Sequence, residues 1–268
     1  MQIHESAENY LETILMLSKK LPVVRSAFQT NLPGVYAAGD ATRGPATVVE
    51  GIADAARFAQ EAESNCYMIR EEDKCMIIDP NDFTAIRELL QKWGLMPGLV
   101  LLTHEHCDHI GGLNELRRTY PVTVAATEAC SAGIGNQTRN MSRMMETFLY
   151  FKGGEKKLVH YPPFQCRKAD LTFTDRICCK FATRQLELIP LPGHTPGSMV
   201  IRYDGCIFCG DYLLPGDRVV TRLPGGDGDA YEKYAKPWLK TIPDGTWIFP
   251  GHGEPFRMNR EVREFHEL

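Results

Sequence analysis

The chain has 268 residues, of which 43% are hydrophobic and 24% charged, a composition that excludes a disordered or collagen-like protein. The formal net charge is −4, which argues against a nucleic-acid-binding surface. No apolar run approaches the length that a membrane span needs, and the start of the chain lacks the pattern of a secretory signal. Nine cysteines in this context favour reduced thiols. We therefore expect a cytoplasmic protein that binds neither nucleic acid nor membranes.

The first 64 residues differ in pattern from the rest of the chain. Apolar residues at helical spacing predict a helix over residues 6–20, and a second helix is expected after Gly44-Pro45. Between them, residues 34–38 (GVYAA) could serve as a strand at the edge of a sheet. We expect residues 1–64 to form a short, mainly helical extension and residues 65–268 to form the main domain.

From Asn65 onward, short apolar segments alternate with turns and helices. Residues 65–70 and 74–79 predict a hairpin, and the helix expected over Phe83–Trp93 should end at Gly94. The other expected strands cover residues 99–103, 122–126, 186–191, 199–203, 206–210 and 247–250, and the other helices cover residues 111–120 and 231–242. Residues 136–168 have mixed helical character and are expected to lie over the domain. Strands grouped in succession, with helices between the groups, favour stacked sheets covered by helices.

The densest chemical signal is the segment Thr103-His104-Glu105-His106-Cys107-Asp108-His109, which follows a predicted buried strand. His104 and His106 lie two residues apart in an extended segment, so they point the same way and can bind one metal ion together. Asp108 and His109 lie where the chain turns into the next helix and can bind a second ion nearby. Imidazole and carboxylate ligands suit zinc, and also iron or manganese.

Three later segments supply further candidate ligands. His194 lies in a Pro/Gly-rich loop between two predicted strands, Asp211 follows the strand over residues 206–210, and His252 follows the last strand. Together with the first motif, these residues supply enough ligands for a site that holds two metal ions.

The motifs HEHCDH, GHTPGS and GHG, with an aspartate after the intervening strand, resemble the metallo-β-lactamase superfamily in order and context over residues 65–268. The resemblance implies an α+β fold, a four-layer αβ/βα sandwich with its site at one edge between the sheets. It also implies two ligand sets, in which Asp211 bridges both ions. The first set is His104, His106 and His194, and the second is Asp108, His109 and His252.

Asp211 also indicates a branch of the superfamily, because true β-lactamases lack a bridging carboxylate at that position. Flavodiiron proteins have a glutamate where His106 stands, and Glu105 occupies a different position. The sequence around His109 is most similar to the glyoxalase-II-like hydrolases. Few residues follow His252, whereas glyoxalase II carries a C-terminal helical domain that helps to bind glutathione. This difference favours a smaller thioester or another acyl compound as the substrate.

The expected function is therefore that of a dinuclear metal-dependent hydrolase with a small-molecule substrate. A hydroxide that bridges two divalent cations, zinc in the first instance, would attack a thioester, lactone or related ester carbonyl. Asp108 would orient this hydroxide and is the expected catalytic residue. The alternative is an oxidoreductase, because iron-dependent persulfide dioxygenases share these ligands. The sequence leaves the oligomeric state open.

Two partial resemblances lie in the first 64 residues. Residues 5–26 are similar to the opening helix of diphtheria-toxin-repressor-type regulators. Residues 30–62 are similar to the closing segment of flavoproteins of the glutamate-synthase small-subunit type, in which Asp40 would meet the flavin. Since the rest of each domain is missing, we expect neither specific DNA binding nor flavin binding, although a flavoprotein-derived oxidoreductase belongs to the alternative above.

The remaining sulfur-containing and aromatic residues are expected to pack rather than to react. Cys206 and Cys209 have CxxC spacing, but residues three apart on a strand face opposite ways. The adjacent Cys178 and Cys179 are also expected to pack. A run of methionine and aromatic residues is expected to form core or lid packing rather than a substrate entrance. It comprises Met141, Met144, Met145, Phe148 and Tyr150.

Overall fold

The computed structural model describes residues 35–38, 64–71, 74–152 and 160–268, and the strands of this part form two six-stranded sheets. The first sheet has the order β1-β2-β3-β4-β5-β6, and the second has the order β12-β11-β10-β9-β8-β7. The strands of the first sheet are β1 (Val35–Ala38), β2 (Cys66–Glu71), β3 (Lys74–Ile78), β4 (Met96–Leu101), β5 (Thr123–Thr127) and β6 (Leu171–Phe173). Those of the second are β7 (Ile177–Phe181), β8 (Arg184–Pro190), β9 (Met199–Tyr203), β10 (Cys206–Gly210), β11 (Trp247–Pro250) and β12 (Phe256–Arg257).

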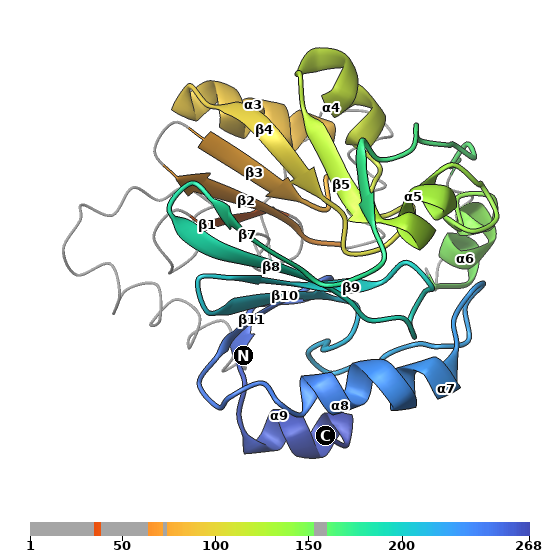
Figure 1. Ribbon diagram of the computed structural model, residues 1–268. Helices are drawn as coiled ribbons and strands as arrows, with labels where there is room; N and C mark the ends of the chain where they lie inside the picture. The colour runs from red at the N-terminus through yellow and green to blue at the C-terminus, as the bar shows by residue number, and fades with distance from the viewer. Residues whose placement is uncertain (1–34, 39–63, 72–73, 153–159) are drawn as a thin grey trace, which may run out of the picture.

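The helices cover the outer faces of the two sheets, which gives a four-layer α+β sandwich (Figure 1). The helices beside the first sheet are α3 (Phe83–Trp93), α4 (Leu113–Thr119) and α5 (Glu128–Ile134), with α6 (Met145–Lys152) at one end of the sandwich. Those beside the second are α7 (Gly228–Ala230), the π-helical turn η2 (Tyr231–Ala235), α8 (Lys236–Leu239) and α9 (Arg260–His266). Within the described residues, no helix combines the length and the apolar character that crossing a bilayer requires.

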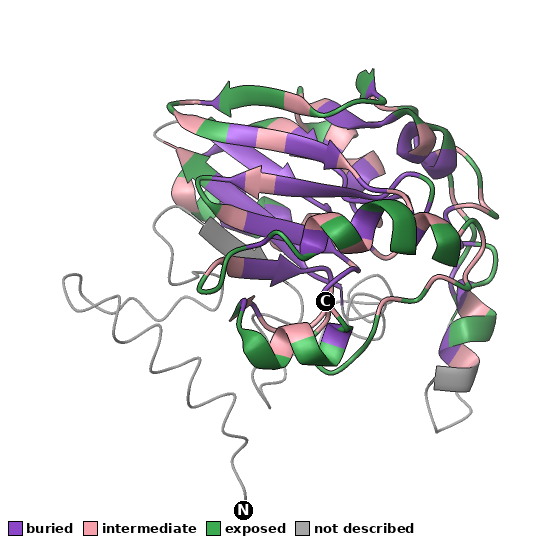
Figure 2. Cartoon of the chain, turned by 60° about the horizontal axis from the view of Figure 1, so that its bottom comes forward, coloured by how far each residue is buried: buried purple, intermediate pink, exposed green. Residues whose placement is uncertain are grey.

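Three apolar cores lie between the four layers. Successive residues of a strand face opposite sides of its sheet, so each buried strand contributes side chains to two of these cores. On β2, Met68 packs toward the helices of the first layer, whereas Tyr67 packs between the two sheets with Phe208 and Phe249. The third core joins the second sheet to the C-terminal helices. Figure 2 shows the result, with strands largely buried and helices exposed on one side.

Local signals account for the helix α3, whose predicted bounds are confirmed. The side chain of Asp82 accepts hydrogen bonds from the backbone N–H of Thr84 at 2.8 Å and of Ala85 at 3.1 Å. Such a cap satisfies N–H groups that have no partner inside the helix. At the other end Gly94 has φ 62°, a left-handed conformation that favours glycine.

The predicted edge strand is present as β1. It pairs antiparallel with β2, and Val35 lies opposite Ile69 while Ala38 lies opposite Cys66. The other expectations for the first 64 residues lie outside the described residues, namely the two helices and the two partial family resemblances.

We expect removal of β1 to destabilise the first sheet. A chain that starts at residue 39 should have a Tm about 4–8 °C lower than one that starts at residue 35, because the backbone hydrogen bonds between β1 and β2, worth about 1 kcal/mol each, are lost. Light scattering should also rise, since the edge of β2 becomes available to other chains. Calorimetry of the two truncated chains measures the difference, and equal Tm values would contradict a stabilising role for β1.

Several predicted elements differ from the structure. The strand expected at residues 99–103 begins at Met96, because a register shift against β3 accommodates Pro97-Gly98. The helix expected over residues 231–242 runs from Gly228 to Leu239 and contains a π-helical turn. The helices α5 and α9 and the strands β6 and β12 were not predicted.

The expected packing of Cys178 and Cys179 is wrong, since both side chains are exposed. They lie on β7, which pairs with β8 at the edge of the second sheet of the described residues. Cys209 is buried as expected, and Cys206 is half-buried.

Candidate metal centre

The seven candidate ligands lie in segments that follow four strands and meet between the two sheets. His104, His106, Asp108 and His109 follow β4 in the first sheet. His194, Asp211 and His252 follow β8, β10 and β11 in the second sheet. Residues from both sheets therefore form a single cluster.

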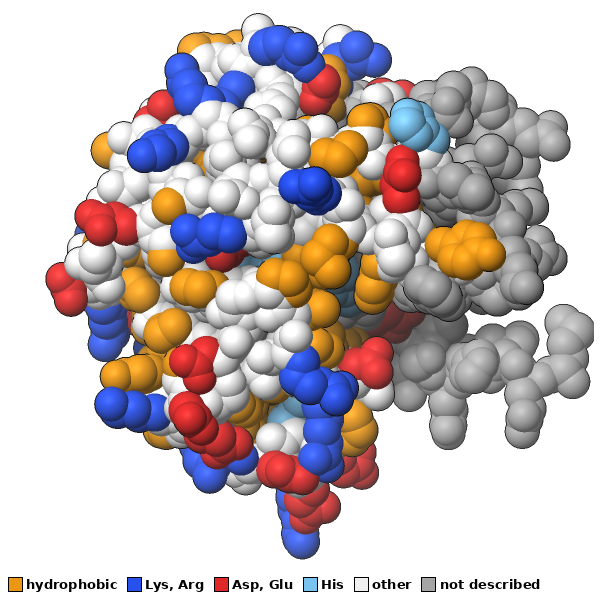
Figure 3. All heavy atoms as spheres, turned by 90° about the vertical axis from the view of Figure 1, so that its right-hand side faces the viewer, with side chains coloured by type: hydrophobic (Ala, Val, Ile, Leu, Met, Phe, Trp, Pro, Cys, Tyr) orange, Lys and Arg blue, Asp and Glu red, His pale blue; other side chains and the backbone are white. Residues whose placement is uncertain are grey.

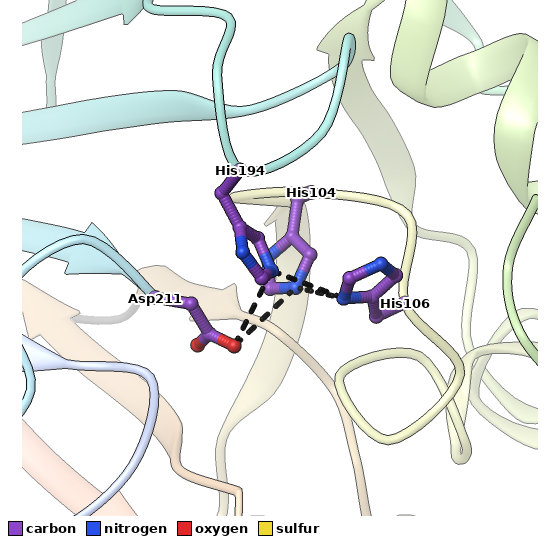
Figure 4. Close-up of side chains that lie close together, drawn as sticks. All are labelled: His104, His106, His194 and Asp211. Carbon is purple, nitrogen blue, oxygen red and sulfur yellow. Dashed lines mark hydrogen bonds and ion pairs between the residues drawn. The ribbon is translucent and has the colours of Figure 1, made fainter. Parts of the chain in front are cut away.

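Three imidazoles and one carboxylate form the first group, shown in Figure 4. The Nδ1 atom of His106 lies 3.1 Å from Nε2 of His104 and 3.1 Å from Nε2 of His194. The Oδ2 atom of Asp211 lies 3.9 Å from Nε2 of His104 and 3.5 Å from Nε2 of His194.

Asp108, His109 and His252 form the second group. The Oδ2 atom of Asp108 lies 3.4 Å from Nε2 of His252 and 3.7 Å from Nε2 of His109. Asp211 approaches this group too, with Oδ1 at 3.4 Å from His109 Nε2 and Oδ2 at 3.5 Å from His252 Nε2. Asp211 is thus the residue that lies against both groups.

The geometry of the cluster fits divalent metal ions. Two ligand atoms bound to one tetrahedral zinc at about 2.1 Å lie about 3.4 Å apart, close to the spacings above. Among the described residues, the buried atoms without a hydrogen-bond partner include Nε2 of His109 and Oδ1 of Asp211. Buried polar atoms normally have a partner, so a cation between these atoms would supply what they lack.

Hydrogen bonds from outside the cluster orient three of the imidazoles. The Nδ1 atom of His194 lies 2.7 Å from the carbonyl oxygen of Val220, and Nδ1 of His104 lies 3.0 Å from Oγ1 of Thr103. In the same way, Nδ1 of His109 lies 3.1 Å from Oδ2 of Asp79. These partners turn Nε2 of each ring toward the cluster, as is typical of metal-binding histidines.

Asp79 was not among the residues predicted from the sequence. It follows the apolar strand β3 with φ 53°, and its carboxylate also accepts hydrogen bonds from the backbone N–H of Thr103 at 2.7 Å and from its hydroxyl at 2.5 Å. An aspartate directly after an apolar strand is the same signal that identified Asp211, and it could have identified Asp79.

The pKa shifts differ between the two groups. Burial lowers the pKa of His194 and takes that of His106 to about 3, so the first group presents neutral imidazoles. In the second group burial also disfavours charge, but Asp211 and Asp108 raise the pKa of His252 to about 10. Asp108 has a pKa of about 2 despite its burial, because His109 and His252 hold it ionised. A bound cation would replace the protons that balance these carboxylates.

Cys107 and part of the methionine run pack next to the ligand segment. Met141 and Met145 are buried as expected, in one apolar cluster that also contains Cys107. Met144 and Phe148 are instead 45% and 46% exposed. Figure 3 shows hydrophobic side chains around a recess with histidine at its floor, on the side of the molecule where α6 lies.

Comparison with known proteins identifies the class to which this fold and cluster belong. Residues 60–252 match the family model of the metallo-beta-lactamase superfamily, and the chain belongs to this superfamily.

Among its relatives, the probable metallo-hydrolase YqgX of Bacillus subtilis is 28% identical over 194 residues, which cover 71% of this chain and 85% of the relative. A hydroxyacylglutathione hydrolase of Aeromonas salmonicida is 28% identical over 188 residues, which cover 69% of this chain but only 59% of the relative. These relatives confirm the predicted glyoxalase-II-like resemblance.

Solved structures agree with the predicted fold. The BLEG-1 B3 metallo-beta-lactamase has a TM-score of 0.63 at 24% identity, and the match covers 76% of this chain and 92% of that one. TTHA1623, solved in a di-iron-bound form, has a TM-score of 0.58 at 25% identity, and the match covers 75% of this chain and 92% of that one. The α+β sandwich predicted from the sequence is confirmed.

Proposed function

We propose that this protein is a dinuclear metal-dependent hydrolase that cleaves a thioester, lactone or related ester of a small molecule, and that residues 65–268 form its hydrolase domain. The observation that carries the proposal is the position of Asp211, whose two oxygens lie 3.4–3.9 Å from imidazole nitrogens of both groups. The hydroxyacylglutathione hydrolase relative supports ester-like chemistry, and the di-iron form of TTHA1623 supports two ions.

In this proposal each group of ligands would hold one ion, and Asp211 would contribute to both sites. His104, His106 and His194 would hold the first, and Asp108, His109 and His252 the second. The nitrogen and oxygen donors suit zinc best, and also iron or manganese. Two divalent cations here would bring the pKa of a shared water toward neutrality and polarise the carbonyl under attack.

The protein's own residues would orient the attacking water and the metal-binding imidazoles. Asp108 has its Oδ2 atom at the cluster and would accept a hydrogen bond from the attacking water, which fixes the direction of its lone pair. Val220, Thr103 and Asp79 keep the imidazoles in one orientation, so the site does not have to reorganise when substrate binds. Hydrolysis then adds one water across the acyl bond and gives a carboxylic acid and a thiol or alcohol, which for a lactone stay on the same molecule.

Removal of metal tests the proposal. The full chain dialysed against a chelator should hydrolyse neither a short acyl thioester nor a simple lactone, and added zinc, manganese or ferrous iron should restore activity toward at least one of them. Undiminished hydrolysis by the metal-free protein would contradict the proposal. Oxygen consumption with a thiol persulfide by the iron-loaded protein, without hydrolysis of either probe, would instead support the persulfide dioxygenase alternative.

The contact between Asp79 and His109 gives a second prediction. Asp79→Asn should lower the affinity for divalent metal about 10–100-fold, because the amide no longer offers a charged acceptor to the His109 ring. Competition with a coloured chelator measures the affinity. Asp175→Asn, on the exposed turn after β6, is the matched control and should leave it unchanged. Equal affinities for the two variants would count against a supporting role for Asp79.

A further inference from the structure

Glu105 lies between two candidate ligands in the chain, yet its carboxylate belongs to neither metal-binding group. The residue is 1% exposed. Its Oε2 atom accepts a hydrogen bond from the hydroxyl of Thr195 at 2.8 Å, and Oγ1 of Thr195 in turn accepts a hydrogen bond from the backbone N–H of Gly197 at 3.2 Å. The Oε1 atom lies 3.8 Å from Nη2 of Arg139, a partly exposed side chain. Burying a carboxylate is costly unless it is hydrogen-bonded, and these donors meet that need.

The surroundings of this carboxylate are shaped to receive it. A Cβ atom on Gly133, in α5, would lie 2.6 Å from Cγ of Glu105, and a Cβ atom on Gly197 would collide with Oε2. Thr195 is itself held by Ser198, because its backbone N–H donates to Oγ of Ser198 at 3.0 Å and the two hydroxyls lie 2.9 Å apart. The hydroxyl that reaches Glu105 therefore comes from an ordered loop.

The contact joins the two segments that carry the ligands of the first group. Glu105 is flanked by His104 and His106 after β4, and Thr195 directly follows His194 after β8. The two segments are also joined by a hydrogen bond from the backbone N–H of Met199, at the start of β9, to the carbonyl of Thr103. The hydrogen bond between Glu105 and Thr195 therefore joins the residue between His104 and His106 to the residue that follows His194.

We propose that Glu105 is a positioning residue for the first metal ion, which holds the His194 loop against the His104–His106 segment through Thr195. The inference rests on the proposed two-metal function and assigns this residue to one of the two ions. Glu105→Gln replaces one carboxylate oxygen by an NH2 group. Because each oxygen of Glu105 faces a donor and an NH2 group cannot accept, one of these contacts is lost. The second group contains none of His104, His106 and His194, so its affinity for metal should not change in Glu105→Gln.

Zinc affinity, measured by competition with a chelator in two backgrounds of the full chain, tests the proposal. In His252→Ala, which keeps the first group intact, Glu105→Gln should weaken zinc binding about 10–100-fold. In His194→Ala, which keeps the second group intact, it should change zinc binding less than about twofold. Glu146→Gln is the matched control, because the Glu146 carboxylate bonds to Tyr161 in the neighbouring segment, and it should have no effect in either background.

A second pair of variants keeps the test decisive if Glu105→Gln fails to fold. In the His252→Ala background, Thr195→Val removes the hydroxyl that reaches Glu105 at nearly constant volume and should weaken zinc binding, while Thr195→Ser should restore it. Unchanged zinc affinity in Glu105→Gln or Thr195→Val, or an equal loss in both backgrounds, would overturn the inference. A parent chain that binds no zinc at all would instead contradict the proposed function.

Discussion

Asp211→Asn is expected to lower kcat/KM at least about a thousandfold, a loss of about 4 kcal/mol of transition-state stabilisation. Asp211 places carboxylate oxygens close to both groups, with Oδ1 at 3.4 Å from His109 Nε2 and Oδ2 at 3.5 Å from His194 Nε2. An asparagine keeps the shape but loses the charge and one acceptor oxygen, so it cannot bind both ions equally.

Steady-state kinetics and metal analysis of the same preparation measure this effect. Asp211→Asn should retain at most one ion per chain, whereas the exposed Asp175→Asn should behave like the parent protein. Since Asp211 is a candidate ligand and not part of the apolar cores, the fold should persist, which circular dichroism can verify. Full activity of Asp211→Asn would show that no bridging carboxylate is needed.

The second large effect concerns the core between the sheets. Phe249→Ala should lower the free energy of unfolding by about 3–5 kcal/mol, because it leaves a cavity at a fully buried position. The ring of Phe249 stacks on Phe208 with centroids 4.8 Å apart and meets Tyr67 edge-on at 5.4 Å. For a domain of this size, the loss corresponds to a Tm about 10 °C lower.

A phenylalanine on the surface provides the comparison for this stability measurement. Phe265 is 40% exposed, and Phe265→Ala should change the free energy of unfolding by about 0.5 kcal/mol or less. Thermal unfolding of both variants with the same metal content gives the two values. A smaller loss for Phe249→Ala than for Phe265→Ala would show that the interface between the sheets is not the main core.

The sequence predicted the candidate ligands because their signals are local. Each stands close after an apolar strand or in a loop fixed by Pro and Gly. The short spacing of His104, His106, Asp108 and His109 already predicts that they bind metal ions at one site. The helix α3 was predicted with its bounds for the same reason, since Asp82 and Gly94 mark its ends.

Asp79 could have been named as a candidate from its position directly after an apolar strand, but the roles of Asp79 and Glu105 depend on tertiary neighbours. The parallel pairing of β3 with β4 puts Ile78 opposite Leu101, and this register brings Asp79 to Thr103 and His109. The partner of Glu105, Thr195, lies 90 residues later in the chain. No spacing rule connects such positions.

The packing predicted for Cys178 and Cys179 failed for a related reason. Apolar residues on a strand are normally buried, and nothing in the local pattern shows that β7 lies at the edge of its sheet. Whether a strand is central or at an edge is decided by the order of the whole sheet, which includes residues from distant parts of the chain.

A crystal structure of the protein grown with zinc, with anomalous diffraction recorded at the zinc edge, would show whether two metal ions bind where we propose. We expect two anomalous peaks in each molecule, one among His104, His106 and His194 and the other among Asp108, His109 and His252, with Asp211 between them. A single peak, or two peaks bound by other side chains, would contradict this proposal.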